Sequence, residues 1–248
     1  MYLYNASALA LAGEIRRPFQ RIIDTQASAC LAMIGGISNA EVDNFEVKGI
    51  ASFRRAYATT SGSFDPKNQT HNTSVRVVVE GLNVLDMISA DRVIALLSSE
   101  YSPKESQPRI LATGSRFENL RISGERIETE FETNLLDECD TFAKFERSYP
   151  HDLFGKRRGR QEPGGKEFYR VSLVKNVSSR FPLRTKRGGL AIEIANFGRI
   201  HLAELFIEHS RRQLNMLRLD LGSPVAGNLL IASASCNGLG GDPGTEDD

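Results

Sequence analysis

The hydrophobic positions between residues 74 and 131 fall in short runs that suit β-strands. β-branched and aliphatic residues dominate the runs at 74–85 and 92–98, and glycines separate the segments that follow. Runs of this length bounded by turn residues are typical of strands. Residues 93–97 could instead begin a helix capped by Ser89 or Asp91, but the neighbouring strand-like runs favour a hairpin. The stretch therefore predicts the core of a β-sheet.

Similar patterns extend the sheet in both directions along the chain. Residues 2–15 place leucines on one alternation and alanines on the other, so one strand face is small enough to lie close to another sheet. Ile127, Thr129 and Phe131 alternate with glutamates, which predicts a strand with one solvated face. Apolar runs separated by glycines predict four further strands, at 190–195, 200–207, 214–221 and 229–233.

One segment has helical spacing instead. Between about 135 and 147, apolar residues recur every three or four positions while charged residues occupy the other faces; the apolar set is Leu135, Leu136, Cys139, Phe142 and Phe145. Asn134 is suited to cap its first turn. We therefore expect one amphipathic helix packed across a sheet or at its end.

These elements predict an all-β fold, either an antiparallel β-sandwich or a flattened barrel, with ten or more strands. The length of 248 residues suits one large β-domain. We expect a single domain over residues 1–236, interrupted by a basic, loop-rich insertion at about 147–189. Residues 237–248 are rich in Gly and Asp and predict a flexible tail.

Composition adds few constraints. Hydrophobic residues make up 40% and charged residues 25%, which is ordinary for a folded globular protein. The 31 basic residues balance 31 acidic ones, so no net charge directs the chain to nucleic acid or to an anionic membrane. Cys30, Cys139 and Cys236 are too widely spaced for a metal motif and predict buried free thiols in a reducing compartment.

The apolar run at residues 6–12 is too short for a membrane span and has no basic residue before it, as a secretory leader would. We therefore expect a cytoplasmic protein without a membrane span. No cofactor motif is present, and we expect none to be bound.

Three sequence blocks resemble a family of uncharacterised bacterial proteins. They are the Gly-Leu-Asn-Val-Leu-Asp-Met-Ile-Ser-Ala-Asp-Arg-Val block at 81–93, the Gly-Ser-Arg-Phe-Glu-Asn-Leu-Arg-Ile-Ser-Gly block at 114–124, and a closing block in two parts, at 197–205 and 216–224. The resemblance implies no activity. The central block is also weakly similar to bacterial surface β-domains, and that resemblance implies only a β architecture.

The nearest approach to a catalytic cluster is His201 with Glu204, to which Arg218 could add a charge. A histidine beside a carboxylate can act as a base, but polar residues on a solvated sheet face would give the same pattern. Glu208 and His209 lie further along, and strand geometry would separate His201 from His209 by about 27 Å, too far to share a metal.

The basic insertion is the candidate surface for a polyanion or nucleic acid. Its basic residues could contact phosphates; they are Lys156, Arg157, Arg158, Arg160, Arg184, Lys186 and Arg187. A charge run in a loop is more often simply solvated, so nucleic-acid binding is the third hypothesis. The first is a non-enzymatic structural or protein-interaction module that forms a homo-oligomer or binds a protein partner, because long β-chains expose strand edges. The second is a small-molecule or enzymatic site near His201.

Overall fold

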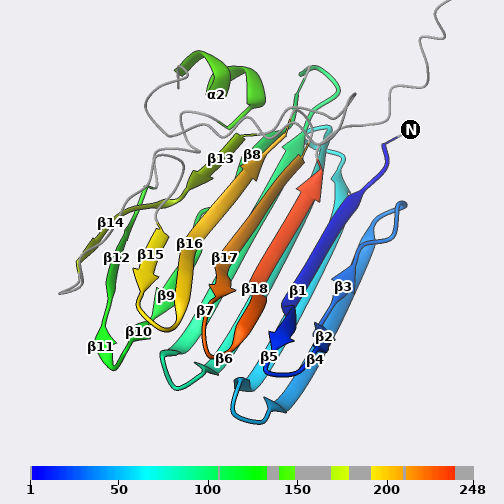
Figure 1. Ribbon diagram of the computed structural model, residues 1–248. Coiled ribbons are helices and arrows are strands. Elements are labelled where there is room, and N and C mark those ends of the chain that lie inside the picture. The colour runs from blue at the N-terminus through cyan, green and yellow to red at the C-terminus, as the bar shows by residue number, and fades with distance from the viewer. Residues whose placement is uncertain are drawn as a thin grey trace, which may run out of the picture.

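The computed structural model describes residues 2–105, 107–132, 140–148, 169–178, 191–208 and 211–237. Within these residues, two large antiparallel sheets pack face to face, with β18 crossing β6 and β7 (Figure 1). The sheets end in different edge strands and do not close on each other. This confirms the all-β prediction and selects the sandwich from its two alternatives.

We call the first sheet the terminal sheet, because it joins strands from both ends of the sequence. Its strand order is β13-β16-β17-β18-β1-β2, with β15 beside β16 and β3 beside β1. The strands are β1 (Asn5–Arg17), β2 (Arg21–Gln26), β3 (Ala29–Cys30), β13 (Tyr169–Ser172), β15 (Ala191–Ile194), β16 (Gly198–Ile207), β17 (Arg211–Leu221) and β18 (Ala226–Asn237).

The second sheet, here the central sheet, contains the stretch that the sequence singled out. Its order is β11-β10-β7-β6-β5-β4, with β8 and β9 also beside β7. The strands are β4 (Gly36–Val47), β5 (Ala51–Asp65), β6 (Thr70–Val84), β7 (Ile88–Tyr101), β8 (Arg109–Leu111), β9 (Arg116–Glu118), β10 (Arg121–Ile122) and β11 (Glu125–Arg126). The hairpin predicted at 74–98 is confirmed as β6 and β7.

A short two-stranded sheet, β12 (Glu128–Phe131) with β14 (Val174–Ser178), lies along one side of the sandwich, and α2 (Phe142–Ser148) lies at one end (Figure 1). The predicted helix at 135–147 is confirmed only at its C-terminal half. Residues 133–139 lie outside the described residues, and Asp140 and Thr141 precede the helix as non-helical residues. Phe145 is fully buried, as its place in the apolar stripe predicts.

The core fills the space between the two sheets. Valines of β6 and alanines of β5 face leucines and isoleucines of β17 and β18, and small alanines of β1 face inward, as predicted for a closely covered strand; examples are Ala6, Ala58, Val77, Leu217 and Ile231, all at most 3% exposed. Cys236 is buried as expected, but Cys30 is exposed, so the prediction of buried thiols is wrong for Cys30. Cys139 lies outside the described residues.

Each long strand changes the face that it buries part of the way along. In β6, every second residue faces the core, first Val75, Val77 and Val79 and then Leu82 and Val84. Between Val79 and Leu82 the spacing is three positions instead of two. The same shift occurs opposite it in neighbouring strands, where one residue of each drops out of the pairing register. We call these aligned positions a phase-shift row; the central sheet's row is Asn44, Arg54, Gly81 and Asp91.

The terminal sheet has a phase-shift row of its own, which consists of Ala10, Ala203, Met216 and Ala232. Left-handed backbone marks both rows, with φ of 64° at Gly81, 53° at Asn44, 45° at Ala203 and 51° at Ala232. A left-handed residue of this kind lets the side chains before and after it point to opposite faces from those that strict alternation would give, as the extra residue of a β-bulge does. Strict alternation therefore holds on either side of each row but not across it.

Backbones approach closely where β1 meets β18. A Cβ added at Gly227 would lie 2.1 Å from the carbonyl oxygen of Glu14. At Gly222 the nearest atom to an added Cβ would be 3.5 Å away, an ordinary contact.

We therefore predict that Gly227→Ala lowers the free energy of unfolding by about 2 kcal/mol, because the added methyl group forces the two strands apart. Gly222→Ala is the control and should change the free energy by less than about 0.5 kcal/mol. Urea unfolding followed by circular dichroism measures both, and equal effects would contradict the close approach.

Candidate functional site

The structure brings His201, Glu204 and Arg218 into one cluster on the outer face of the terminal sheet. His201 Nδ1 lies 3.2 Å from Glu204 Oε1, and Arg218 donates from Nε to Glu204 Oε2 at 2.6 Å. His201 is directly opposite Arg218 in the pairing of β16 with β17. We call these residues, together with Asp220 and Arg170, the charge cluster.

The phase-shift row places His201 and Glu204 on one face. In a regular strand, residues three apart point to opposite faces. Left-handed Ala203 removes this reversal, so Ile200 and Leu202 face the core before it and Leu205 faces the core after it. Glu204 consequently lies beside His201 rather than in the core.

Two residues that the sequence interpretation missed complete the charge cluster. Asp220 Oδ2 lies 3.0 Å from His201 Nε2 and accepts from Arg218 Nη1 at 2.8 Å. Arg170 Nη1, on β13, lies 3.6 Å from Glu204 Oε1. The alternation of Arg218, Leu219 and Asp220 would have placed Asp220 on the face of Arg218, but strand order was needed to bring β13 alongside.

Burial and ion pairing shift the pKa values of the charge cluster in a consistent pattern. Burial would raise the pKa of Glu204, but hydrogen bonds from His201 and Arg218 outweigh it and lower the pKa to about 2. The hydrogen bond from His201 is the largest effect on Asp220 and lowers its pKa to about 2 as well. Burial would lower the pKa of His201, but hydrogen bonds to Asp220 and Glu204 outweigh it and raise the pKa.

This arrangement favours a structural role over catalysis. Both ring nitrogens of His201 face carboxylates, so the protonated imidazolium is favoured and has no free lone pair to accept a proton. Arg218 donates to both carboxylates at once. The charge cluster thus ties β13, β16 and β17 together, and its carboxylates are already engaged.

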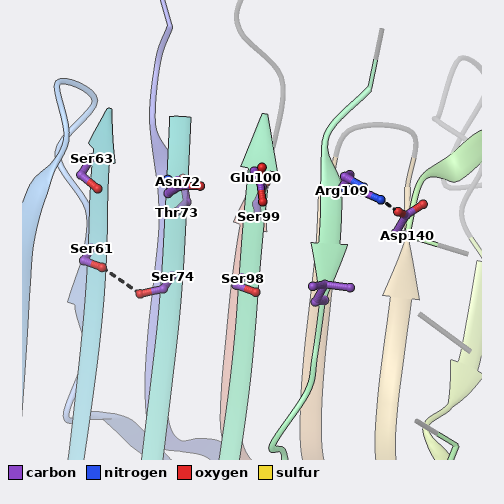
Figure 2. Close-up of a pocket in the computed structure, with 11 residues that line it drawn as sticks. Ser61, Ser63, Asn72, Thr73, Ser74, Ser98, Ser99, Glu100, Arg109 and Asp140 are labelled. Atoms are coloured by element: carbon purple, nitrogen blue, oxygen red, sulfur yellow. Dashed lines mark hydrogen bonds and ion pairs between the residues drawn. The ribbon is translucent and has the colours of Figure 1, made fainter. Parts of the chain in front are cut away.

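A second site, which the sequence interpretation did not find, is a hollow of about 460 Å³ on the outer face of the central sheet. Serines of three neighbouring strands line its floor, because Ser61 pairs with Ser74 and Ser74 pairs with Ser98 in the strand register (Figure 2). The Ser61 and Ser74 hydroxyl groups are hydrogen bonded at 2.8 Å. Serines near several strand ends were visible in the sequence, but their alignment depends on register.

Charged residues form one wall of this serine hollow. Arg109 Nε donates to Asp140 Oδ2 at 2.9 Å (Figure 2). Lys144 Nζ lies 2.8 Å from Asp140 Oδ1. Asp140 is 3% exposed and has a lowered pKa, because hydrogen bonds from Lys144 and Arg109 outweigh its burial. Glu100 lines the same hollow, and within the described residues no ion pair engages it.

The polyanion candidates of the basic insertion, which are Lys156, Arg157, Arg158, Arg160, Arg184, Lys186 and Arg187, lie outside the described residues, as does His209. Over the ranges that the structure describes, no group of three or more His, Cys, Asp or Glu side chains is arranged to hold a metal ion. In the same ranges, no helix has the length and apolar character needed to cross a membrane.

The fold and these sites define an all-β sandwich domain with a largely buried cluster of paired charges and a polar hollow. The chain belongs to the family described as domain of unknown function DUF8256, whose model matches residues 2–158. This agrees with the predicted resemblance to an uncharacterised family. Comparison with curated proteins and with solved structures found no match.

The charge cluster predicts that removing the charge of its buried carboxylate lowers the free energy of unfolding much more than removing the charge of an exposed carboxylate. Glu204→Gln should lower the free energy of unfolding by about 3 kcal/mol, because two arginines and His201 lose their buried partner. Glu14→Gln is the matched control, since Glu14 pairs with Arg16 at the surface and should cost less than about 1 kcal/mol. Urea unfolding at pH 7 measures both, and a cost below that of the control would refute the clustering.

The raised pKa of His201 predicts a pH dependence of stability. A raised folded-state pKa stabilises the protein below about pH 6.5, the unfolded value, and this stabilisation is lost as the pH rises through the folded value. His71, whose pKa burial lowers, acts in the opposite direction. The difference in unfolding free energy between wild type and His201→Gln should therefore be larger at pH 6 than at pH 9. A difference that is constant across this range would contradict the pKa shift.

Proposed function

We propose that the protein is a non-enzymatic interaction module that self-associates through one corner of the sandwich. The observation that supports this proposal best is the grouping of exposed apolar side chains. Most of the large apolar side chains exposed in the described residues lie at this apolar corner, which comprises Leu3, Met33, Ile34, Ile37 and Phe64. A grouped apolar surface is typical of an interaction site, whereas scattered apolar residues are ordinary.

Pairing and hydrogen bonding bring these residues together. Tyr4 N donates to the Met33 carbonyl oxygen at 2.9 Å, so Leu3 lies beside the 33–34 segment. Gly36 pairs with Gly62, and Ile37 pairs with Ser61, so the start of β4 lies beside the end of β5 that leads to Phe64. Ile34 and Ile37 are 81% and 73% exposed, which leaves most of their apolar surface in water.

The apolar corner adjoins an open strand edge. In the described part of the chain, β4 pairs with β5 on one side and with no strand on the other. Glu41, Asp43 and Glu46 lie between residues 41 and 47, where charges discourage edge pairing. Residues 36–40 contain no charge. The part of the edge that is free to pair with another strand is therefore the part beside the apolar corner.

The distribution of charge along β4 favours a second copy of this chain as the partner that pairs with this open edge. It does so at one particular pairing register. An antiparallel pairing of two β4 strands about Ser38 places Ile37 opposite Asn39 of the partner subunit. The acidic half of each β4 then extends past the start of the other β4, so the carboxylates do not face one another. A two-fold contact of this kind is self-complementary and would continue the central sheet across both subunits.

We predict that the wild-type protein forms dimers and that Ile37→Lys weakens the dimer at least about tenfold, as expected for the loss of a buried apolar contact together with a new charge repulsion. Sedimentation velocity over a concentration series gives the dissociation constant.

Ile22→Lys is the matched control, since Ile22 is 72% exposed on the edge strand β2 of the other sheet. This substitution should leave the dimer unchanged. A wild-type protein that stays monomeric at several hundred micromolar would overturn the proposal, as would equal effects of the two substitutions. A bacterial origin and a cytoplasmic location remain predictions from the sequence.

A further inference from the structure

We propose that the serine hollow on the central sheet binds a neutral carbohydrate. The hollow has about 460 Å³ of space, which lies within the range of small-molecule sites, roughly 300–1,000 Å³. It adjoins the apolar corner, because Ser61 of its floor pairs with Ile37, but its lining is polar, and this proposal does not depend on self-association.

The lining offers many hydrogen-bonding groups that are not engaged elsewhere. Ser63 projects from β5, and Ser98 and Glu100 project from β7 (Figure 2). In the described residues, no side-chain hydrogen bond or ion pair occupies any of the three. Serine hydroxyls both donate and accept, and a carboxylate accepts two hydrogen bonds, so together they suit a ligand that carries several hydroxyl groups.

Strand geometry sets the spacing of these groups. Ser61, Ser74 and Ser98 form one cross-strand row, and Ser63, Asn72 and Glu100 form the next. Neighbouring strands lie about 4.8 Å apart, so β5 and β7, on either side of β6, are about 9.6 Å apart, a span that a pyranose ring with one hydrogen bond at each end can bridge. A sugar ring lying over β6 could therefore bond to β5 and β7 at the same time.

The charge of the lining argues against an anion. Arg109 is paired with Asp140, and Asp140 also pairs with Lys144, so the positive charges at this wall are already engaged. Glu100 adds a second carboxylate to the lining and lies opposite Arg109 in the pairing of β7 with β8, so Arg109 has carboxylates on two sides. A phosphate or carboxylate ligand would meet this negative charge, whereas a neutral sugar would not.

The shape and polarity of the lining argue against a lipid or a flat aromatic ligand. Leu111 is the one large apolar side chain among the lining residues of the described chain, and no aromatic residue lines the hollow there. Ligands held by apolar contact need predominantly hydrophobic walls. Binding through hydroxyl, amide and carboxylate groups alone should be weak, in the millimolar range typical of few hydrogen bonds exposed to water.

The test is saturation-transfer difference NMR on the full chain with glucose, galactose, mannose, N-acetylglucosamine, maltose and cellobiose as separate probes. At least one probe should give a signal that saturates with concentration. Ser98→Phe fills the hollow and should abolish that signal. Glu100→Gln should weaken binding about tenfold, the effect of one charge-assisted hydrogen bond, while Glu130→Gln, an exposed carboxylate on β12, should not change it.

Unchanged urea midpoints show that each variant is folded. The absence of a signal from every probe would overturn the proposal, and so would a signal that persists in Ser98→Phe. Spermidine serves as a further probe: if it binds in a salt-dependent way that requires Glu100 while the sugars do not bind, the hollow is an amine site and the carbohydrate proposal is wrong. Sedimentation behaviour is measured separately, so failure here leaves the proposed self-association untouched.

Discussion

The two phase-shift rows are the constraint on which the rest of the structure depends. Long strands must keep one face in the core along their whole length, yet both sheets contain a position where alternation is interrupted in every central strand at once. Because the interruption is aligned across neighbours, the pairing register survives and the apolar face remains continuous. A shift in one strand alone would have pointed the core side chains on one side of the shift toward solvent. The same interruption at Ala203 creates the charge cluster, since it places His201 and Glu204 on one face.

The sequence was informative where alternation is regular and uninformative where it is interrupted. The β-rich architecture and the hairpin of β6 and β7 follow from runs such as Val75, Val77 and Val79. His201, Glu204 and Arg218 could be proposed as neighbours, and alternation along β17 would have added Asp220. Arg170 could not be joined to them, because β13 pairs with β16 across a long stretch of sequence. The serine hollow depends on the register of three strands and on a wall that includes Asp140, and no local pattern indicates such a combination.

The two faces of the sandwich differ in how completely their polar groups are engaged. On the terminal sheet, each carboxylate of the charge cluster meets a cation, and the buried network stabilises the contact between β13, β16 and β17. On the central sheet, hydroxyl groups and Glu100 remain available to solvent. Paired buried charges define a unique local arrangement, whereas unengaged groups on a rigid sheet are pre-positioned for a ligand. The first face is therefore suited to stability and the second to recognition.

The position of β1 between β18 and β2 has a consequence for how the chain acquires its structure. Strands β4 to β7 follow one another and pair in sequence order, so this sheet can assemble during synthesis from local contacts. β1 pairs locally with β2 and β3, but its other edge pairs with β18, and closing so long a loop is entropically costly. Until then the inner apolar face of β6 and β7 lacks the cover that β17 and β18 give it. The nascent protein is thus most vulnerable to aggregation just before β18 emerges, and slow translation or a chaperone acting at that stage would improve the yield of folded protein.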